Sequence, residues 1–192
     1  MNASNQMTIS MWLKWTNQAT ANRYAFVRYV DSQTGWRCRL NNTAWLTYYY
    51  TNGGSQFIAT PGAVATNDIW FYFTLTIDNN NKLMNYYVDG KNILSQSMLY
   101  SYRENPNSFL YLGGIHEAWA GVGMEGFIDE ARYYKKALSS TEVSNLYASY
   151  LLDFISGIQN SFITNQSFIL SLEIKKTNGY WSTNGAVFYT IP

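Results

Sequence analysis

Apolar and polar residues alternate with a period of two in several stretches of the chain, which is the pattern of β-strands with one buried face. In residues 7–14, every second residue is apolar, and residues 69–78 carry the longest run of this kind. Similar runs cover 23–31, 35–40, 44–50, 82–90, 108–114 and 124–134. Strands at intervals of roughly ten residues predict an antiparallel β-sandwich rather than a parallel α/β sheet.

Turn residues separate these runs and set the order of the expected strands. The segments DSQTG and LNNT lie between the runs 23–31, 35–40 and 44–50, which predicts a three-stranded meander. NNN follows Asp78, and Asp89-Gly90 is a turn signal that favours positive φ at the glycine. Because NNN provides the turn between them, we expect 69–78 and 82–90 to form a hairpin.

One segment follows a helical pattern instead. Ser139 and Glu142 have the spacing of a capping box, and the apolar residues after them recur at helical intervals through Leu151. The sequence thus predicts a helix of at least one and a half turns that lies on a sheet face or rim. Alone it would be marginal, so packing must hold it.

Composition narrows the classes of partner. The chain has 192 residues, with 13 basic and 12 acidic side chains scattered without runs. This balance disfavours nucleic acid and anionic lipid as partners. No stretch approaches the length of a membrane span, and the N-terminus lacks the pattern of a signal peptide. Polarity comes largely from neutral groups, including 20 Asn and 17 Tyr, which suit sugars and other neutral polar surfaces.

The segments MTISMWLKW, IWFYFTLTID, YYVDG, LYLGG and GFIDEARYYKKALSSTEVSNLY resemble, in order and spacing, the landmarks of laminin-G-like domains. These domains belong to the concanavalin A-like lectin/glucanase superfamily. The resemblance covers about residues 7–147. It implies an all-β fold, an antiparallel two-sheet jelly-roll sandwich, with one short helix on its C-terminal side.

The resemblance also suggests a division of the chain. Residues 1–150 would form the sandwich, although the strands that usually precede the TISMW equivalent are absent. Residues 151–192 extend past the family's usual end and alternate at 167–175 and 186–191. We expect two strands there that complete or extend the sheets, or that pair with another chain, because an uncovered edge would aggregate.

Catalytic constellations are not evident. Glu125 and Asp129 share a strand face at roughly 13 Å, at about 3.3 Å per residue, whereas glycosidase carboxylates lie roughly 5 to 9.5 Å apart. His116 is the only histidine and Cys38 the only cysteine, which disfavours zinc. We expect Cys38 to pack as a small apolar side chain. The sequence therefore predicts a protein without enzymatic activity and without an organic cofactor.

Calcium is the one metal that the resemblance implies. Related domains bind a structural Ca²⁺ through an acid at the position of Asp129, together with oxygens from N-terminal strands that are missing here. The alternative is that Asp129 is a buried, hydrogen-bonding acid at a strand junction. Six to eight oxygens would be needed for the ion.

Aromatic residues, 18% of the chain, are the most suggestive feature for function. Trp12, Trp70 and Tyr72 fall opposite the apolar face of their strands, where flat rings could stack on sugars. The alternative is that these rings are covered by loops, the helix or another chain. The candidate ligand-binding residues are Arg28, Trp45, Tyr48, Tyr50 and Trp119.

Two functions remain open from the sequence. The first is a non-catalytic binding or adhesion module for a glycan or protein ligand. The second is a structural subunit, such as part of a viral capsid, a fibre or another surface assembly, in which neighbouring chains cover the aromatics. A glycan-active enzyme comes third. Each of the first two places the chain outside cells or on a virion or cell surface.

Overall fold

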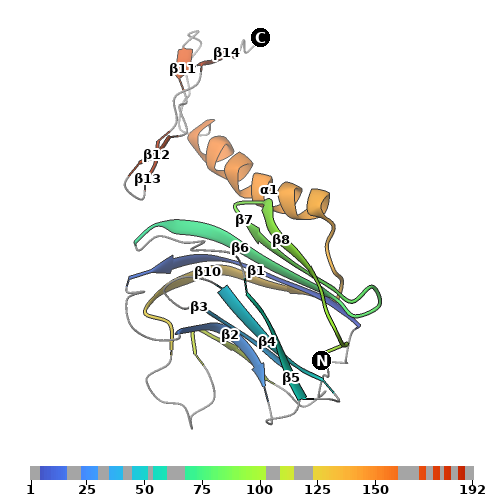
Figure 1. The fold of residues 1–192 in the computed structure, drawn as a ribbon. Coiled ribbons are helices and arrows are strands. Elements are labelled where there is room, and N and C mark those ends of the chain that lie inside the picture. The colour runs from blue at the N-terminus through green and yellow to red at the C-terminus, as the bar shows by residue number, and fades with distance from the viewer. Residues whose placement is uncertain are drawn as a thin grey trace. The chain divides into compact units, whose positions relative to one another are not determined.

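The computed structural model describes residues 5–16, 23–29, 35–40, 45–51, 54–59, 68–102, 109–114, 123–159, 169–171, 175–177, 180–182 and 186–188. The chain divides into two compact units, Met1–Leu146 and Tyr147–Pro192. The larger unit contains two five-stranded antiparallel sheets in two layers (Figure 1). The prediction of a two-sheet sandwich with one helix in the described chain is confirmed.

The first sheet has the strand order β10-β1-β6-β7-β8 and carries the candidate site. Its strands are β1 (Gln6–Trp15), β6 (Trp70–Asp78), β7 (Leu83–Val88), β8 (Lys91–Ser97) and β10 (Gly126–Tyr134). The hairpin between β6 and β7 forms as predicted. The next turn, between β7 and β8, contains Asp89 with φ 50° and Gly90 with φ 73°, as a two-residue hairpin turn with positive φ at both positions requires.

The second sheet has the order β5-β4-β3-β2-β9. Its strands are β2 (Arg23–Tyr29), β3 (Trp36–Leu40), β4 (Trp45–Thr51), β5 (Gly54–Ala59) and β9 (Phe109–Leu112). The predicted meander of β2, β3 and β4 is present. The sequence pattern does not predict β5 and β8, because neither GSQFIA nor KNILSQS shows a clean alternation of apolar and polar residues.

The core lies between the sheets and contains the predicted apolar faces. All apolar residues at alternate positions of β1 and β6 are at most 2% exposed: Met7, Ile9, Met11, Leu13, Phe71, Phe73, Leu75 and Ile77. The ring of Phe73 lies 5.6 Å from that of Phe26 on the opposite sheet. Cys38 is buried among these residues, as expected.

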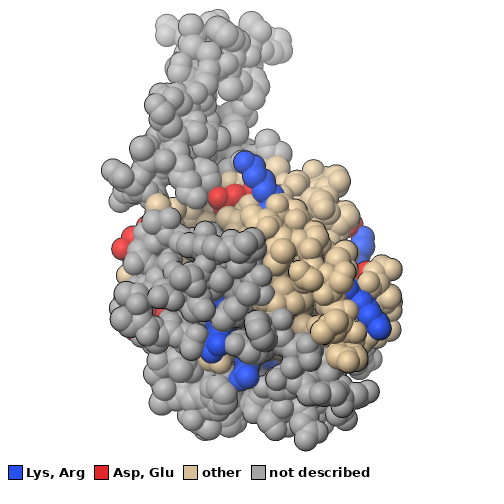
Figure 2. Space-filling model, in the orientation of Figure 1, with Lys and Arg blue, Asp and Glu red and all other residues tan. Residues whose placement is uncertain are grey.

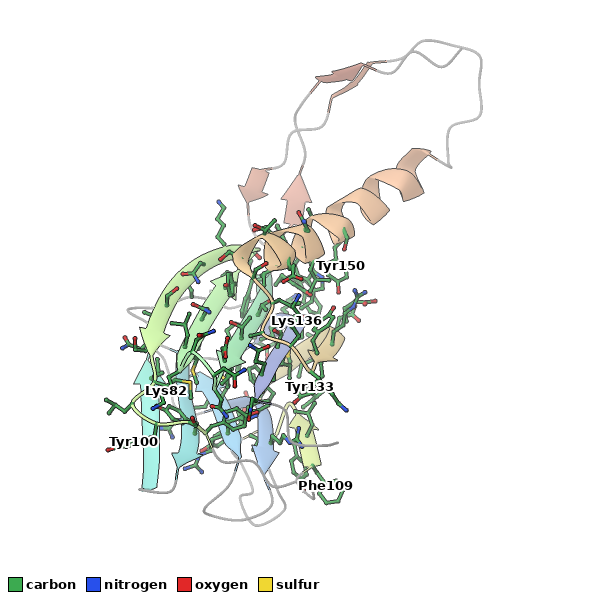
Figure 3. All side chains as sticks on the ribbon, turned by 90° about the vertical axis from the view of Figure 1, so that its right-hand side faces the viewer. Lys82, Tyr100, Phe109, Tyr133, Lys136 and Tyr150 are labelled. Carbon is green, nitrogen blue, oxygen red and sulfur yellow. The ribbon has the colours of Figure 1, made fainter. Side chains whose placement is uncertain are left out.

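The outer face of the first sheet is covered near the start of β1. Thr8 donates a hydrogen bond from Oγ1 to the Lys136 carbonyl (2.7 Å) and accepts one from the Leu138 N–H (2.9 Å). These two residues belong to the connection from β10 to the helix α1 (Ser140–Gln159), and Figure 3 labels Lys136 in it. The connection explains why Thr8 is buried although it faces away from the core.

The helix begins with the predicted capping box. Ser139 N–H donates to Glu142 Oε2 (2.8 Å), and Glu142 N–H donates to Ser139 Oγ (3.3 Å). Its first turns contact the sheet, since Ser144 Oγ donates to the Gly90 carbonyl (2.8 Å) and Val143 is fully buried. The helix continues beyond the predicted segment to Gln159, and residues 151–159 contain no proline that would break it.

Residues 147–192 form the second unit, which contains four short strands in addition to the rest of α1. β11 (Ile169–Ser171) pairs with β14 (Ala186–Phe188), and β12 (Lys175–Thr177) pairs with β13 (Tyr180–Ser182). Each pair is a sheet of its own. This pairing lends no support to the expectation that the extension completes the sandwich sheets; donation of a strand to another chain stays a prediction.

Candidate functional site

An aromatic patch lies on the outer face of the first sheet, toward the end of β1. We define it as Trp12, Lys14, Trp70, Tyr72 and Phe127. The strand register forms it from three strands: Lys14 pairs with Trp70 on one side and with Phe127 on the other, while Trp12 pairs with Tyr72 and Asp129. Because alternate residues share a face, these side chains form two adjacent rows across β6, β1 and β10.

The first row places a cation between two rings. Trp70 and Phe127 lie on strands that flank β1, roughly 10 Å apart at about 4.8 Å per strand spacing. Their ring centroids are nevertheless only 6.3 Å apart, so the rings incline toward each other over the Lys14 position. The Lys14 ammonium lies 5.9 Å from the centroid of Phe127, within the range of a cation–π contact.

The second row is more deeply buried. The Trp12 and Tyr72 rings are 5.2 Å apart and tilted by 58°, and Tyr72 is fully buried. By contrast, 57% of Phe127 is exposed, and Trp12, Lys14 and Trp70 are half-buried. The patch therefore offers one exposed ring with partly exposed rings beside it, a surface suited to stacking against a flat apolar face.

Gly126 explains why β10 can approach β1 so closely beside Phe127. Its φ is 148°, and a Cβ added there would lie 2.0 Å from the Lys14 carbonyl oxygen. Only glycine fits this position without moving backbone. The strand ends are also tied together, because Thr16 N–H donates to the Glu125 carbonyl (3.0 Å) and Asp68 N–H to the Trp15 carbonyl (2.6 Å).

A β-bulge follows the patch along β10. The register shifts between the pairs Trp12–Asp129 and Ser10–Arg132, and Glu130 adopts a φ of 50°. Asp129 Oδ1 accepts a hydrogen bond from the Glu130 N–H (2.8 Å), while the Glu130 carboxylate pairs with Arg132 (3.0 Å). Bulges of this kind re-aim side chains and are common beside functional sites.

Asp129 itself is exposed, so the alternative in which it is a buried acid is wrong. It lies on the outer face opposite Trp12, where the bulge opens the strand to solvent. Within the described ranges, no group of three or more His, Cys, Asp or Glu side chains could hold a metal ion. Backbone carbonyl and amide oxygens also bind Ca²⁺, so Asp129 as a metal ligand stays a prediction.

Arg28, a predicted surface residue, lies inside the sandwich with 2% of its area exposed. Its Nη1 donates a hydrogen bond to Tyr133 Oη (3.2 Å) of the opposite sheet, and its guanidinium lies 6.0 Å from the Tyr133 ring centroid. Arg28 thus links the two layers. This placement gives no support to a direct role of Arg28 in ligand binding. Alternation along β2 alone did not reveal that the side chain is buried.

The other predicted binding residues are only partly described. Backbone pairing places Trp45 opposite Leu40, Tyr48 opposite Arg37 and Tyr50 opposite Ser55. Tyr49, between Tyr48 and Tyr50, is buried in the core, and burial raises the pKa of its hydroxyl. The side chains of Trp45, Tyr48 and Tyr50 lie outside the described part, as do Trp119 and His116, so their roles in binding stay predictions.

Other exposed large apolar side chains occur elsewhere among the described residues. Leu99 and Tyr100 follow β8, and Phe109 and Leu112 belong to the edge strand β9. Figure 3 shows Tyr100 and Phe109 pointing away from the sandwich on different sides. On the face in Figure 2, the described charged side chains are scattered and form no cluster of one sign.

Comparison with known proteins places these observations in a family. The sequence model of a laminin-G-like family, described as the concanavalin A-like lectin/glucanases superfamily, matches residues 1–144. Comparison with curated protein sequences finds no match. No helix within the described residues is sufficiently long and apolar to cross a membrane.

Several solved structures share the fold. The CBM40 of the Ruminococcus gnavus IT-sialidase, bound to α2,3-sialyllactose, is 17% identical with a TM-score of 0.62, over 76% of this chain and 84% of that one. A heptameric SAP-like pentraxin from Limulus polyphemus is 12% identical with a TM-score of 0.60, over 75% and 70%. Botulinum neurotoxin type C, in a structure concerned with its interaction with two ganglioside molecules, is 18% identical with a TM-score of 0.57, over 75% and 35%.

Proposed function

The chain belongs to the laminin-G-like domains of the concanavalin A-like lectin/glucanases superfamily, and from that premise we propose that it is a non-catalytic binding module whose ligand is a glycan. The observation that carries the proposal is the aromatic patch, in which Phe127 is 57% exposed beside Trp70 and Trp12. Sugar rings present apolar C–H faces that stack on such rings, while their hydroxyls need donors and acceptors at the rim.

Both kinds of polar group lie beside the rings of the patch. Lys14 can donate hydrogen bonds to hydroxyl oxygens, and the exposed carboxylate of Asp129 can accept them. The backbone ties around Gly126 hold the strand ends in place before a ligand arrives, so binding would cost little ordering entropy. The proposal is further supported by the sugar-binding neighbours, to which this chain is similar in fold.

The absence of catalysis is part of the proposal. Asp129 is an exposed acid beside the patch, and the neighbouring Glu130 carboxylate pairs with Arg132. Hydrolysis of a glycosidic bond normally needs two carboxyl groups on either side of that bond. A module that binds glycans would act outside cells or on a cell or virion surface, where glycans are displayed.

A glycan array followed by titration of the best ligand tests the proposal. Phe127→Ala should abolish binding, since it removes the exposed ring. Phe109→Ala is the matched control, because Phe109 is similarly exposed (66%) but lies on β9 of the other sheet. Binding that survives Phe127→Ala, or an array without any bound glycan, would refute the proposal.

A second candidate, a structural subunit, is favoured by the edge strand β9. Phe109 and Leu112 are 66% and 46% exposed there, and exposed apolar edge strands tend to pair with other chains. In this case Phe109→Ala rather than Phe127→Ala would change behaviour. Sedimentation of both variants separates the candidates: loss of ordered oligomers in Phe109→Ala supports assembly, and a monomeric parent protein excludes it.

A further inference from the structure

Lys14 is the charged residue at the centre of the aromatic patch. It pairs with Trp70 on β6 and with Phe127 on β10, so it has an aromatic neighbour on each side. Its side chain is half-buried, so the stem packs beside the rings while the ammonium can reach the surface of the patch. A neutral residue would suffice for stacking alone, whereas the ammonium adds a charge that a ligand can contact.

The ammonium retains most of its capacity to bind a ligand. Its interaction with the described residues is the cation–π contact with Phe127 at 5.9 Å, and no described acidic side chain forms an ion pair with it. The acid in the next row, Asp129, lies diagonally opposite and accepts the Glu130 N–H. Within the described part of the chain, no oxygen accepts from the three N–H donors of Lys14, and an oxygen of a ligand can take this place.

The surroundings of Lys14 would strengthen such a contact. Rings on both sides exclude part of the water, and hydrogen bonds between ionised partners in such places are shorter and roughly twice as strong as neutral ones. A neutral sugar would leave this partly desolvated cation without a counter-charge. The arrangement consequently discriminates in favour of an anionic group.

We propose that the ligand is a glycan that bears a carboxylate or a sulfate, and that Lys14 binds this group while Trp70 and Phe127 contact the sugar. This inference rests on the proposed function and adds the chemical class of the ligand. A polyanion such as nucleic acid is a poorer fit, because the patch holds a single cation and the chain's charges are balanced at +1.

An array of matched glycans tests the inference, with each neutral core printed beside its sulfated form and its carboxylated form. We expect the charged forms to bind about tenfold more tightly than their neutral cores at low ionic strength. The advantage should shrink moderately as salt is added, because salt screens a partly exposed charge pair less than a fully exposed one. Comparing the sulfated with the carboxylated forms identifies which anion Lys14 binds.

Two lysine variants and a control complete the experiment. Lys14→Gln should lose the preference for charged glycans, and Lys14→Arg should keep it. Lys91→Gln is the control, since Lys91 is exposed at the start of β8, outside the patch. Thermal unfolding verifies that each variant folds.

The outcomes separate this inference from the function on which it rests. If neutral and charged forms bind equally and Phe127→Ala abolishes both, the function stands and the role of Lys14 is refuted. A preference that persists in Lys14→Gln likewise refutes it. If no glycan of either kind binds, both proposals fall.

Discussion

The two ends of the outer face of the first sheet differ in which side chains they bury and which they expose. On the outer face of the first sheet, Thr8 near the start of β1 lies under the connection to α1, which hydrogen-bonds to its hydroxyl. Lys14, six residues or about 20 Å further along, lies among partly exposed rings. Polar side chains are therefore buried at one end of the face, while aromatic side chains are exposed at the other.

Polar residues are usually exposed and aromatic residues buried, and this face reverses that pattern. The reversal indicates that the end with exposed aromatic residues is a binding site. Burying Thr8 is tolerated because both of its hydrogen-bonding roles are satisfied by backbone. Exposing Phe127 brings no comparable benefit to stability, and an exposed aromatic cluster commonly marks an interaction site. The covered end, around Thr8, thus serves folding. We assign binding to the open end, around Lys14 and Phe127.

Gly126→Ala should have the largest effect on stability, because it displaces the backbone at the open end. The new Cβ would meet the Lys14 carbonyl at 2.0 Å, so β10 must move away from β1. We expect a loss of about 2–4 kcal/mol in the free energy of unfolding, measured with urea. Gly114→Ala is the control, since nothing lies within 4 Å of its added Cβ, and it should change stability little. Equal stability of both variants would contradict the close approach.

Thr8→Val tests the covered end. The substitution removes the hydroxyl, so the Lys136 carbonyl and the Leu138 N–H lose their hydrogen bonds to it. We expect the free energy of unfolding to fall by about 1–3 kcal/mol. Thr74→Val is the matched control, because Thr74 is also fully buried but its hydroxyl has no hydrogen-bond partner among the described residues. Urea unfolding should show Thr74→Val to be neutral or stabilising. A larger loss of stability in Thr74→Val than in Thr8→Val would show that the Thr8 hydroxyl does not hold the connection to α1 in place.

The helix start on the covered side should depend weakly on pH. Hydrogen bonds from Lys136 and from Ser139 lower the pKa of the Glu142 carboxyl from 4.5 to about 2. A lowered pKa means that the folded state favours the ionised form, so this stabilisation is present above pH 4.5 and is lost as the pH falls toward 2. Glu142→Gln should abolish that part of the pH dependence. Identical pH profiles of the two proteins, measured by urea unfolding, would contradict the capping role.

Phe127→Ala should have the smallest effect on stability. Because 57% of the residue is already exposed, we expect the free energy of unfolding, measured with urea, to fall by less than about 0.5 kcal/mol. The same variant should lose ligand binding, which sets it apart from Thr8→Val. A large loss of stability would instead mean that Phe127 serves packing, and the contrast between the two ends would fail.

Much of the fold could be predicted from the sequence because the core faces of β1 and β6 alternate cleanly and Ser139 and Glu142 have the capping spacing. β5 and β8 were missed because their residues do not alternate. Arg28 was misread as a surface residue, since alternation along β2 does not reveal that Tyr133 of β10 provides a polar partner inside the sandwich.

The candidate site was only partly predictable. Alternation placed Trp12, Trp70 and Tyr72 opposite the apolar faces of their strands, which the register confirms. Lys14 and Phe127 were missed as site residues, because they are 113 positions apart and only the pairing of β1 with β10 brings them together. No local signal in the sequence specifies that register, although Gly126 beside Phe127 is the residue that permits it.

The most direct test of the account is an NMR titration of the whole chain, labelled on the tryptophan indole N–H groups, with the best glycan from the array. Trp12 and Trp70 should shift with the same affinity, and these shifts should disappear in Phe127→Ala, whereas the signal of the core residue Trp36 stays in place. Shifts confined to Trp45 or Trp119, with Trp12 and Trp70 unmoved, would contradict the assignment of binding to the open end of the sheet.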